Sequence, residues 1–200
     1  MLMEGLTIGR VSGPEENSGI GAPIVALSTP SGRGAIAVVR FSGIGLLSLL
    51  EPILKLKGKS AKLRPRTMHL AEIFSADNQQ VLDEVLICHF PSPNSYTGED
   101  VLEVYPHGSP YIISTFLAAC FRLGVRQALP GEFTRRAFLN GKIDLTAADG
   151  IQGLTEAVSE KQWQAARQLF EGRLGRWVEE LRVKLLRSLA YLEASIDFPD

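Results

Sequence analysis

The stretch SPNSYTGEDVLEVYPHG, residues 92–108, places a dense set of polar side chains between two apolar runs, residues 85–90 and 111–120. Its acids and histidine are Glu99, Asp100, Glu103 and His107. The flanking apolar runs predict core-forming elements, so we expect a rigid scaffold to hold these polar residues in place. The stretch therefore predicts a site of some kind and leaves its chemistry open.

The segment VLEVY, residues 101–105, has the two-residue alternation of a strand, so Glu103 and Leu102 face opposite sides of the sheet. An inward Glu103 needs a partner, because burying a bare carboxylate costs several kcal/mol, whereas an outward one needs none. The sequence leaves both orientations open. His107 is equally compatible with acid–base chemistry near neutral pH and with a structural hydrogen bond.

Composition sets broad limits on the class of protein. The chain has 200 residues, 45% hydrophobic and 22% charged, as expected for one large domain or a domain with an appendage. A net charge of −1 provides no global field toward nucleic acid or anionic membranes. Cys88 and Cys120 lie in apolar runs, which predicts buried thiols in a reducing compartment. No membrane span, signal peptide or metal-ligand spacing is visible, so we expect a cytoplasmic protein without a metal site.

The first 141 residues mix strands and helices. Residues 1–22 predict a loose leader, and order is expected to begin near residue 23. Strands are predicted at 24–27, 35–39, 68–74, 84–90 and 101–105, and helices at 46–56, 111–123 and 132–139. The segments 68–74 and 84–90 are joined by the polar turn 75–78 and predict a hairpin. Because strands and helices do not alternate strictly, we expect an α+β fold.

From Asp144 onward helix formers dominate. Asp144 is a predicted N-cap for a helix ending near Glu156, and Ser159 to Gln162 predicts a capping box. A long amphipathic third helix follows, with apolar residues at three- and four-residue steps from Trp177 to Leu192. Its apolar stripe exceeds what the preceding helices can cover, so we expect a missing part that would complete a bundle.

Two cations have ordinary electrostatic explanations. Lys142 follows a helix C-terminus, where the dipole favours positive charge. Arg40 follows an apolar run, and its side chain could either lie over the edge of a strand or pair with an acidic residue. No Walker A phosphate loop is visible: Gly58-Lys59-Ser60 is the nearest imitation, and Ile53 stands where its first glycine is needed.

Four longer motifs support a family resemblance. They are TPSGRGAIAVVRFSG (29–43), PNSYTGEDVLEVYPHG (93–108), PGEFTRRAFLNGKIDLTAAD (130–149) and EASIDFPD (193–200). Together they resemble the N-terminal part of the MnmE (TrmE) family of tRNA-modification GTPases. The resemblance implies a mixed-sheet tetrahydrofolate-binding and dimerisation domain at 23–141, similar to that of the aminomethyltransferases. It further implies the first half of an all-α helical domain at 142–200, with the GTPase domain absent from this chain.

The resemblance also implies a function for the full-length protein. With the flavoprotein MnmG, family members add an aminomethyl-type (carboxymethylaminomethyl) group to C5 of the wobble uridine of tRNA. The carbon comes from 5-formyltetrahydrofolate or 5,10-methylenetetrahydrofolate. GTP, magnesium and potassium bind in the GTPase domain, and the N-terminal domains form a homodimer. No catalytic residue is expected in the portion present here.

Carried over by position, the folate-binding residues of the family fall on Arg40, Glu103 and Lys142. Two departures leave the pocket shape open. The chain has Tyr-Pro-His-Gly-Ser at 105–109 where the family commonly has Gln-Gly-His-Gly-Gly, and Gly150 stands where an alanine is usual. Two alternatives remain: a stand-alone folate-dependent one-carbon transferase, and a dimerisation scaffold that has lost its ligand.

Overall fold

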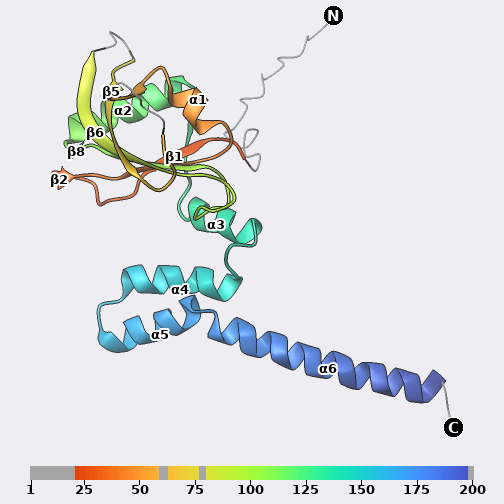
Figure 1. Cartoon of the computed structure of the whole chain (residues 1–200). Helices are drawn as coiled ribbons and strands as arrows, with labels where there is room; N and C mark the ends of the chain where they lie inside the picture. The colour runs from red at the N-terminus through yellow and green to blue at the C-terminus, as the bar shows by residue number, and fades with distance from the viewer. Residues whose placement is uncertain (1–20, 59–62, 77–79, 198–200) are drawn as a thin grey trace, which may run out of the picture. The chain divides into compact units, whose positions relative to one another are not determined.

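The computed structural model describes residues 21–58, 63–76 and 80–197, which fall into two compact units divided between Pro130 and Gly131 (Figure 1). Each unit is considered by itself. The predicted leader lies almost wholly outside the described residues, as does the second half of the predicted turn at 75–78. Strand structure begins at Ile24, next to the position where order was expected.

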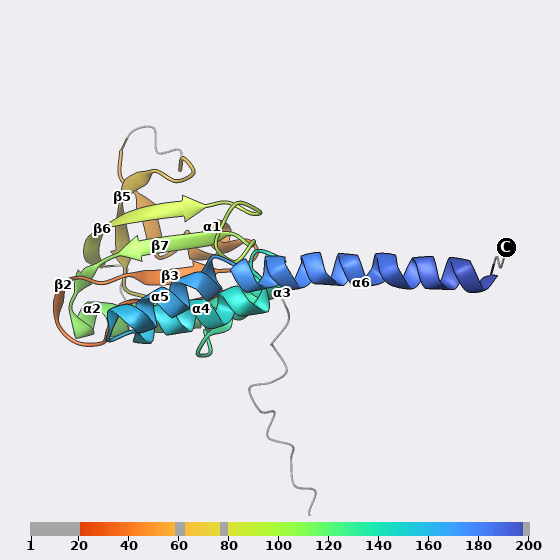
Figure 2. The same cartoon turned by 90° about the horizontal axis from the view of Figure 1, so that it is seen from below.

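The first unit is built on a mixed seven-stranded sheet, in the order β4-β5-β6-β7-β3-β1-β9. Its elements are β1 (Ile24–Leu27), β2 (Gly34–Ile36), β3 (Val39–Ser42), α1 (Leu46–Leu50), β4 (Leu54–Leu56), β5 (Met68–Phe74), β6 (Val81–Phe90), β7 (Val101–Tyr105), β8 (His107–Gly108), α2 (Pro110–Arg122) and β9 (Arg126–Gln127). All neighbouring strands pair antiparallel except β1 and β9, which are parallel. The α+β prediction and the hairpin of β5 and β6 are confirmed, and Figure 2 shows β6, β7 and β3 side by side.

Alternation along the strands gives the sheet two different faces. The core face packs against α1 and α2, and Phe41 meets Phe116 edge to face with ring centroids 6.0 Å apart. Its buried strand residues are Val25, Val39, Phe41, Ala71, Ile73, Val85, Ile87, Leu102 and Val104. We call the opposite side the outer face. By strand register it carries Arg40, Met68, Leu70, Leu86, Cys88, Glu103 and Tyr105.

Two sequence expectations about the first unit are wrong in detail. The run predicted as one strand at 35–39 is divided: β2 pairs with β8 in a separate two-stranded sheet, while β3 joins the main sheet. Arg40 therefore lies inside a strand. The helix predicted at 46–56 ends at Leu50, because Pro52 has no backbone N–H to continue it. Leu54 to Leu56 pairs with β5 instead.

The second unit is helical. It comprises α3 (Glu132–Leu139), α4 (Leu145–Glu156), α5 (Glu160–Phe170) and α6 (Arg173–Asp197). Both predicted caps are confirmed: Asp144 accepts a hydrogen bond from the backbone N of Ala147, and Ser159 accepts one from that of Gln162. At Gly150 the helices α4 and α5 approach closely, since a Cβ there would lie 2.4 Å from the backbone N of Phe170. The glycine that weakens α4 locally thus permits this packing.

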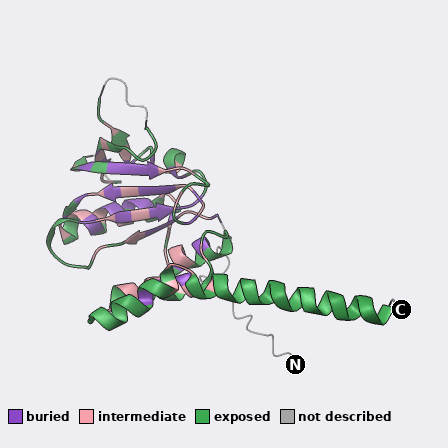
Figure 3. Ribbon diagram, turned by 60° about the horizontal axis from the view of Figure 1, so that its bottom comes forward, coloured by how far each residue is buried: buried purple, intermediate pink, exposed green. Residues whose placement is uncertain are grey.

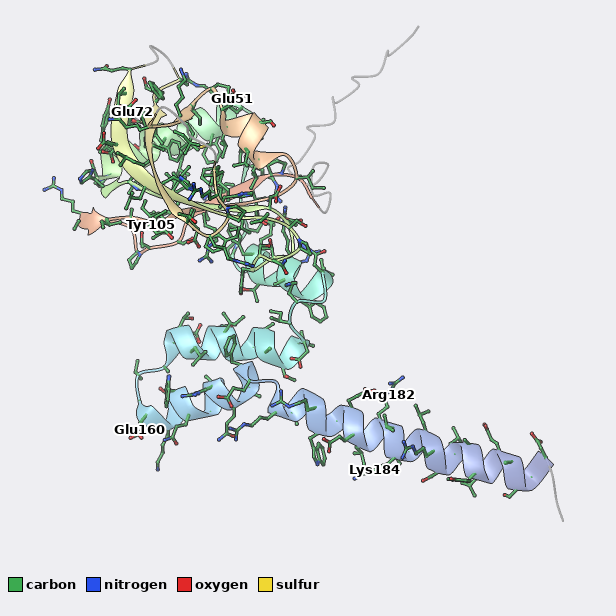
Figure 4. The ribbon with its side chains drawn as sticks, in the orientation of Figure 1. Glu51, Glu72, Tyr105, Glu160, Arg182 and Lys184 are labelled. Carbon is green, nitrogen blue, oxygen red and sulfur yellow. The ribbon has the colours of Figure 1, made fainter. Side chains whose placement is uncertain are left out.

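Helix α6 has no buried residue along its whole described length, and Figure 3 shows it exposed along most of that length. Figure 4 places Arg182 and Lys184 on opposite sides of it. Apolar side chains are exposed as well, including Trp177, Leu185 and Leu192. That a further segment completes this bundle stays a prediction. Among the described residues, no helix is both long and apolar enough to cross a membrane.

Candidate functional site

Arg40 and Glu103 form an ion pair on the outer face. They are register partners on the adjacent strands β3 and β7, although 63 residues separate them along the chain. Arg40 Nε donates to Glu103 Oε1 at 2.8 Å, and Arg40 Nη2 lies 2.7 Å from the same oxygen. The side chains are 32% and 14% exposed. Of the two arginine environments left open by the sequence, the acidic partner is the one observed, and Glu103 is paired and only slightly exposed.

Tyr105 completes the surroundings of this carboxylate. Its hydroxyl donates to Glu103 Oε2 at 2.6 Å. Burial raises the pKa of Tyr105, and the hydrogen bond to the Glu103 carboxylate raises it further. The phenol is therefore neutral at physiological pH, and its hydroxyl remains a hydrogen-bond donor to Glu103. Figure 4 labels Tyr105 in the first unit.

Tyr96 lies against the other member of the pair. The guanidinium carbon of Arg40 is 5.8 Å from the centroid of the Tyr96 ring, within the range of a cation–π contact. Arg40 is thus held between an anion and an aromatic ring. This leaves it less freedom than an isolated surface arginine has.

The loop that carries Tyr96 is anchored by buried hydrogen bonds. Ser42 on β3 donates to Glu99 Oε2 at 2.7 Å, and its hydroxyl lies 2.7 Å from that of Thr97. At the start of the loop, the backbone N of Ser92 donates to Asp100 Oδ1 at 2.9 Å. Glu99 and Asp100 therefore hold the loop in shape. The predicted rigid scaffold around the site is present in these contacts.

His107 has a structural partner. Its Nδ1 lies 2.9 Å from Asp83 Oδ1, and its backbone N donates to Asp83 Oδ2 at 2.8 Å. The Asp83 side chain is 9% exposed, whereas the imidazole is 70% exposed. Of the two roles left open by the sequence, the structural hydrogen bond is the one observed. Within the described ranges, no cluster of three His, Cys, Asp or Glu side chains is placed to hold a metal ion.

Lys142 belongs to the second unit. It follows the C-terminus of α3, is exposed, and its backbone N donates to the carbonyl of Ala137 at 2.8 Å. The structure thus brings two of the three predicted residues together, Arg40 and Glu103. That Lys142 joins them stays a prediction.

A hollow on the first unit is lined by described residues other than the predicted ones. It has a volume of about 340 Å³ and is lined by α1, β4 and β6, and Glu51, labelled in Figure 4, lies at its wall. Neither Arg40 nor Glu103 lines it. Its lining is mostly leucine and isoleucine, without the convergent polar groups expected of a cofactor site.

Sequence reasoning missed Tyr96, Tyr105 and Asp83 as partners of the predicted residues. A signal existed for Tyr105, since two residues along a strand return to the same face as Glu103. No comparable signal existed for Tyr96 or Asp83. Their contacts depend on how a loop and a distant strand fold back.

Comparison with known proteins identifies the class to which this architecture belongs. Residues 23–142 match the family described as GTP-binding protein TrmE N-terminus, and residues 145–200 match the MnmE helical domain. These are the mixed-sheet part and the helical part seen in the fold. The chain therefore belongs to the MnmE (TrmE) family.

Individual relatives show the same relationship. The chain is 43% identical over 180 residues to a protein of Pseudomonas fluorescens, 44% over 181 residues to one of Fervidobacterium nodosum, and 42% over 178 residues to one of Aquifex aeolicus. Each is named tRNA modification GTPase MnmE. The matches cover 88–89% of this chain and 38–39% of each relative, so the chain spans about two fifths of their length.

Proposed function

We propose that this chain is the folate-binding and dimerisation portion of a tRNA-modifying GTPase. The observation that carries the proposal is the Arg40–Glu103 pair, assembled from distant motifs on one sheet face and held by two tyrosines. A charged pair of low exposure outside the core is a candidate for ligand recognition. Family membership supplies the context in which the ligand is a reduced folate.

The residues present fit such a ligand chemically. Glu103 is a hydrogen-bond acceptor suited to the amino-pyrimidinone edge of a pterin. Arg40 and Lys142 supply positive charge for the carbonyls or the glutamate tail of the folate. When bound, 5-formyltetrahydrofolate or 5,10-methylenetetrahydrofolate would supply the one-carbon unit. The role of the residues named here is to bind and orient it.

The activity of the longer protein is part of the same proposal. A GTPase domain that binds GTP, magnesium and potassium would act with the flavoprotein MnmG to modify C5 of the tRNA wobble uridine in the cytoplasm. Homodimerisation is supported by Met68, Leu70 and Leu86, which are exposed apolar side chains on the outer face. Clustered apolar residues on a sheet face indicate a protein–protein contact.

Binding of 5-formyltetrahydrofolate, measured by calorimetry, tests the proposal. Glu103→Ala is expected to weaken binding by about 1.5–3 kcal/mol, the usual contribution of hydrogen bonds to a charged group. Glu84→Ala is the matched control, because Glu84 lies on the neighbouring strand β6 and pairs with Lys57 instead. Equal affinity of the wild-type chain and Glu103→Ala removes Glu103 from the site.

One observation favours a second candidate, a dimerisation scaffold without a ligand. Arg40 and Tyr105 give each oxygen of Glu103 a partner within the chain, so the pair needs no ligand to be stable. Sedimentation and folate titration separate the two candidates. A dimer that binds no reduced folate at millimolar concentration supports the scaffold.

A further inference from the structure

The acceptor capacity of Glu103 is unevenly distributed between its two oxygens. An ionised carboxylate offers about two acceptor positions on each oxygen. Both Nε and Nη2 of Arg40 approach Oε1, at 2.8 and 2.7 Å, so Oε1 is filled. The hydroxyl of Tyr105 takes one position on Oε2. About one acceptor position therefore remains on this carboxylate, and it lies on Oε2.

A pterin presents two neighbouring donors at its amino-pyrimidinone edge, the ring N–H and the 2-amino group. A fork of these donors onto both oxygens of Glu103 would have to displace Arg40 from Oε1. Arg40 is retained there by charge and by its contact with the Tyr96 ring. Bidentate recognition by the carboxylate alone therefore conflicts with the observed pairing.

Tyr105 offers a second acceptor beside Oε2. Its proton is committed to the carboxylate, so the phenolic oxygen can only accept from a ligand. That oxygen lies 2.6 Å from Glu103 Oε2. Because residues 103 and 105 share the outer face, both oxygens belong to the same surface. Together they are two adjacent acceptors on one strand.

We propose that Tyr105 is a ligand-binding, specificity-determining residue, whose phenolic oxygen accepts a hydrogen bond from the 2-amino group of the pterin while Glu103 Oε2 accepts one from the ring N–H. This inference rests on the proposed function, since it assigns the recognition of the same ligand. It leaves the Arg40–Glu103 pair intact on binding. It also gives the tyrosine hydroxyl a role that a phenylalanine of the same shape cannot fill.

The test compares two ligands, 5-formyltetrahydrofolate and its 2-desamino-2-methyl analogue, on three forms of the full chain. These are the wild type, Tyr105→Phe, and Tyr111→Phe as the matched control, since Tyr111 is an exposed residue of α2. The wild type and the control are expected to prefer 5-formyltetrahydrofolate by about tenfold or more, as one buried hydrogen bond implies. Tyr105→Phe is expected to bind it about tenfold more weakly and to bind both ligands almost equally.

The preference ratio separates recognition from a purely structural role. General loosening of the site would weaken both ligands in parallel and leave the ratio unchanged. An unchanged ratio in Tyr105→Phe, with folate still bound, overturns this inference alone. Failure of the wild-type chain to bind 5-formyltetrahydrofolate overturns the proposed function and this inference together.

Discussion

Replacing Gly108 by alanine tests whether the pairing of β2 with β8 supports the site. A Cβ at residue 108 would lie 2.5 Å from the carbonyl oxygen of Gly34 and 2.9 Å from its Cα. Ordinary carbon contacts lie at about 3.5–4.0 Å, so the two strands would have to separate by roughly 1 Å. The obstructing atoms are backbone, and no side-chain rotation can relieve the contact.

The magnitude follows from overpacking and lost hydrogen bonds. Inserting a methyl group into a tightly packed position costs about 1–3 kcal/mol. Disrupting the backbone pairing adds about 0.5–1.5 kcal/mol for each hydrogen bond lost. We expect Gly108→Ala to destabilise the first unit by about 2–3 kcal/mol. Because β8 begins two residues after Tyr105, folate binding should weaken as well.

Calorimetric unfolding and hydrogen exchange of peptides covering β2 and β8 provide the assay. Gly34→Ala is the matched control: it lies opposite Gly108 in the pairing, and its Cβ would meet only the carbonyl oxygen of Ile36, at an ordinary 3.6 Å. The control is expected to change stability by less than about 1 kcal/mol. Equal effects of the two substitutions would refute the reasoning, as would unchanged exchange protection in Gly108→Ala.

Three further predictions concern stability and reactivity. Ser42→Ala removes the buried donor to Glu99 and should cost about 1–3 kcal/mol in chemical denaturation; an unchanged midpoint contradicts this. Asp144→Ala removes the cap of α4 and should lower the free energy of unfolding by about 1 kcal/mol. Unfolding is measured by the fluorescence of the two tryptophans, which both lie in the second unit. The hydrogen bond from the Ala147 N–H lowers the pKa of Asp144 in the folded state. The stabilisation by this cap is therefore present above the pKa of Asp144 in the unfolded chain, and is lost as the pH falls through its pKa in the folded chain. If stability depends on pH in the same way in the wild type and in Asp144→Ala, this expectation is contradicted. Burial raises the pKa of Cys120 to about 12, so a thiol reagent at pH 8 should label it only after unfolding, and native-state labelling refutes its burial.

Local signals accounted for much of the fold. The strands β1, β5 and β7 and the helix α2 were predicted within a few residues, because their periodicity and flanking turn residues are local properties. Where local signals conflicted, prediction failed. The run at 35–39 is uniformly apolar, so nothing within it indicates that its two ends pair with different sheets.

The candidate site was predictable in part. Arg40 and Glu103 were named from motifs, but the strand alternation left open which face of the sheet Glu103 occupies and whether it is paired. That the partner is Arg40 depends on the register between β3 and β7, which no short segment encodes. Tyr96 reaches Arg40 only because Ser42 and Glu99 anchor its loop.

By itself, the sequence of this protein determined its α+β beginning and helical continuation, and its four long motifs determined its family. These depend on residue type and spacing, which are read directly along the chain. Only the tertiary structure decided that Glu103 Oε1 is filled by Arg40 and that Tyr105 stands beside Oε2. The partners of each carboxylate oxygen are set by which side chains lie beside it, and these come from strands that meet only when the sheet has formed.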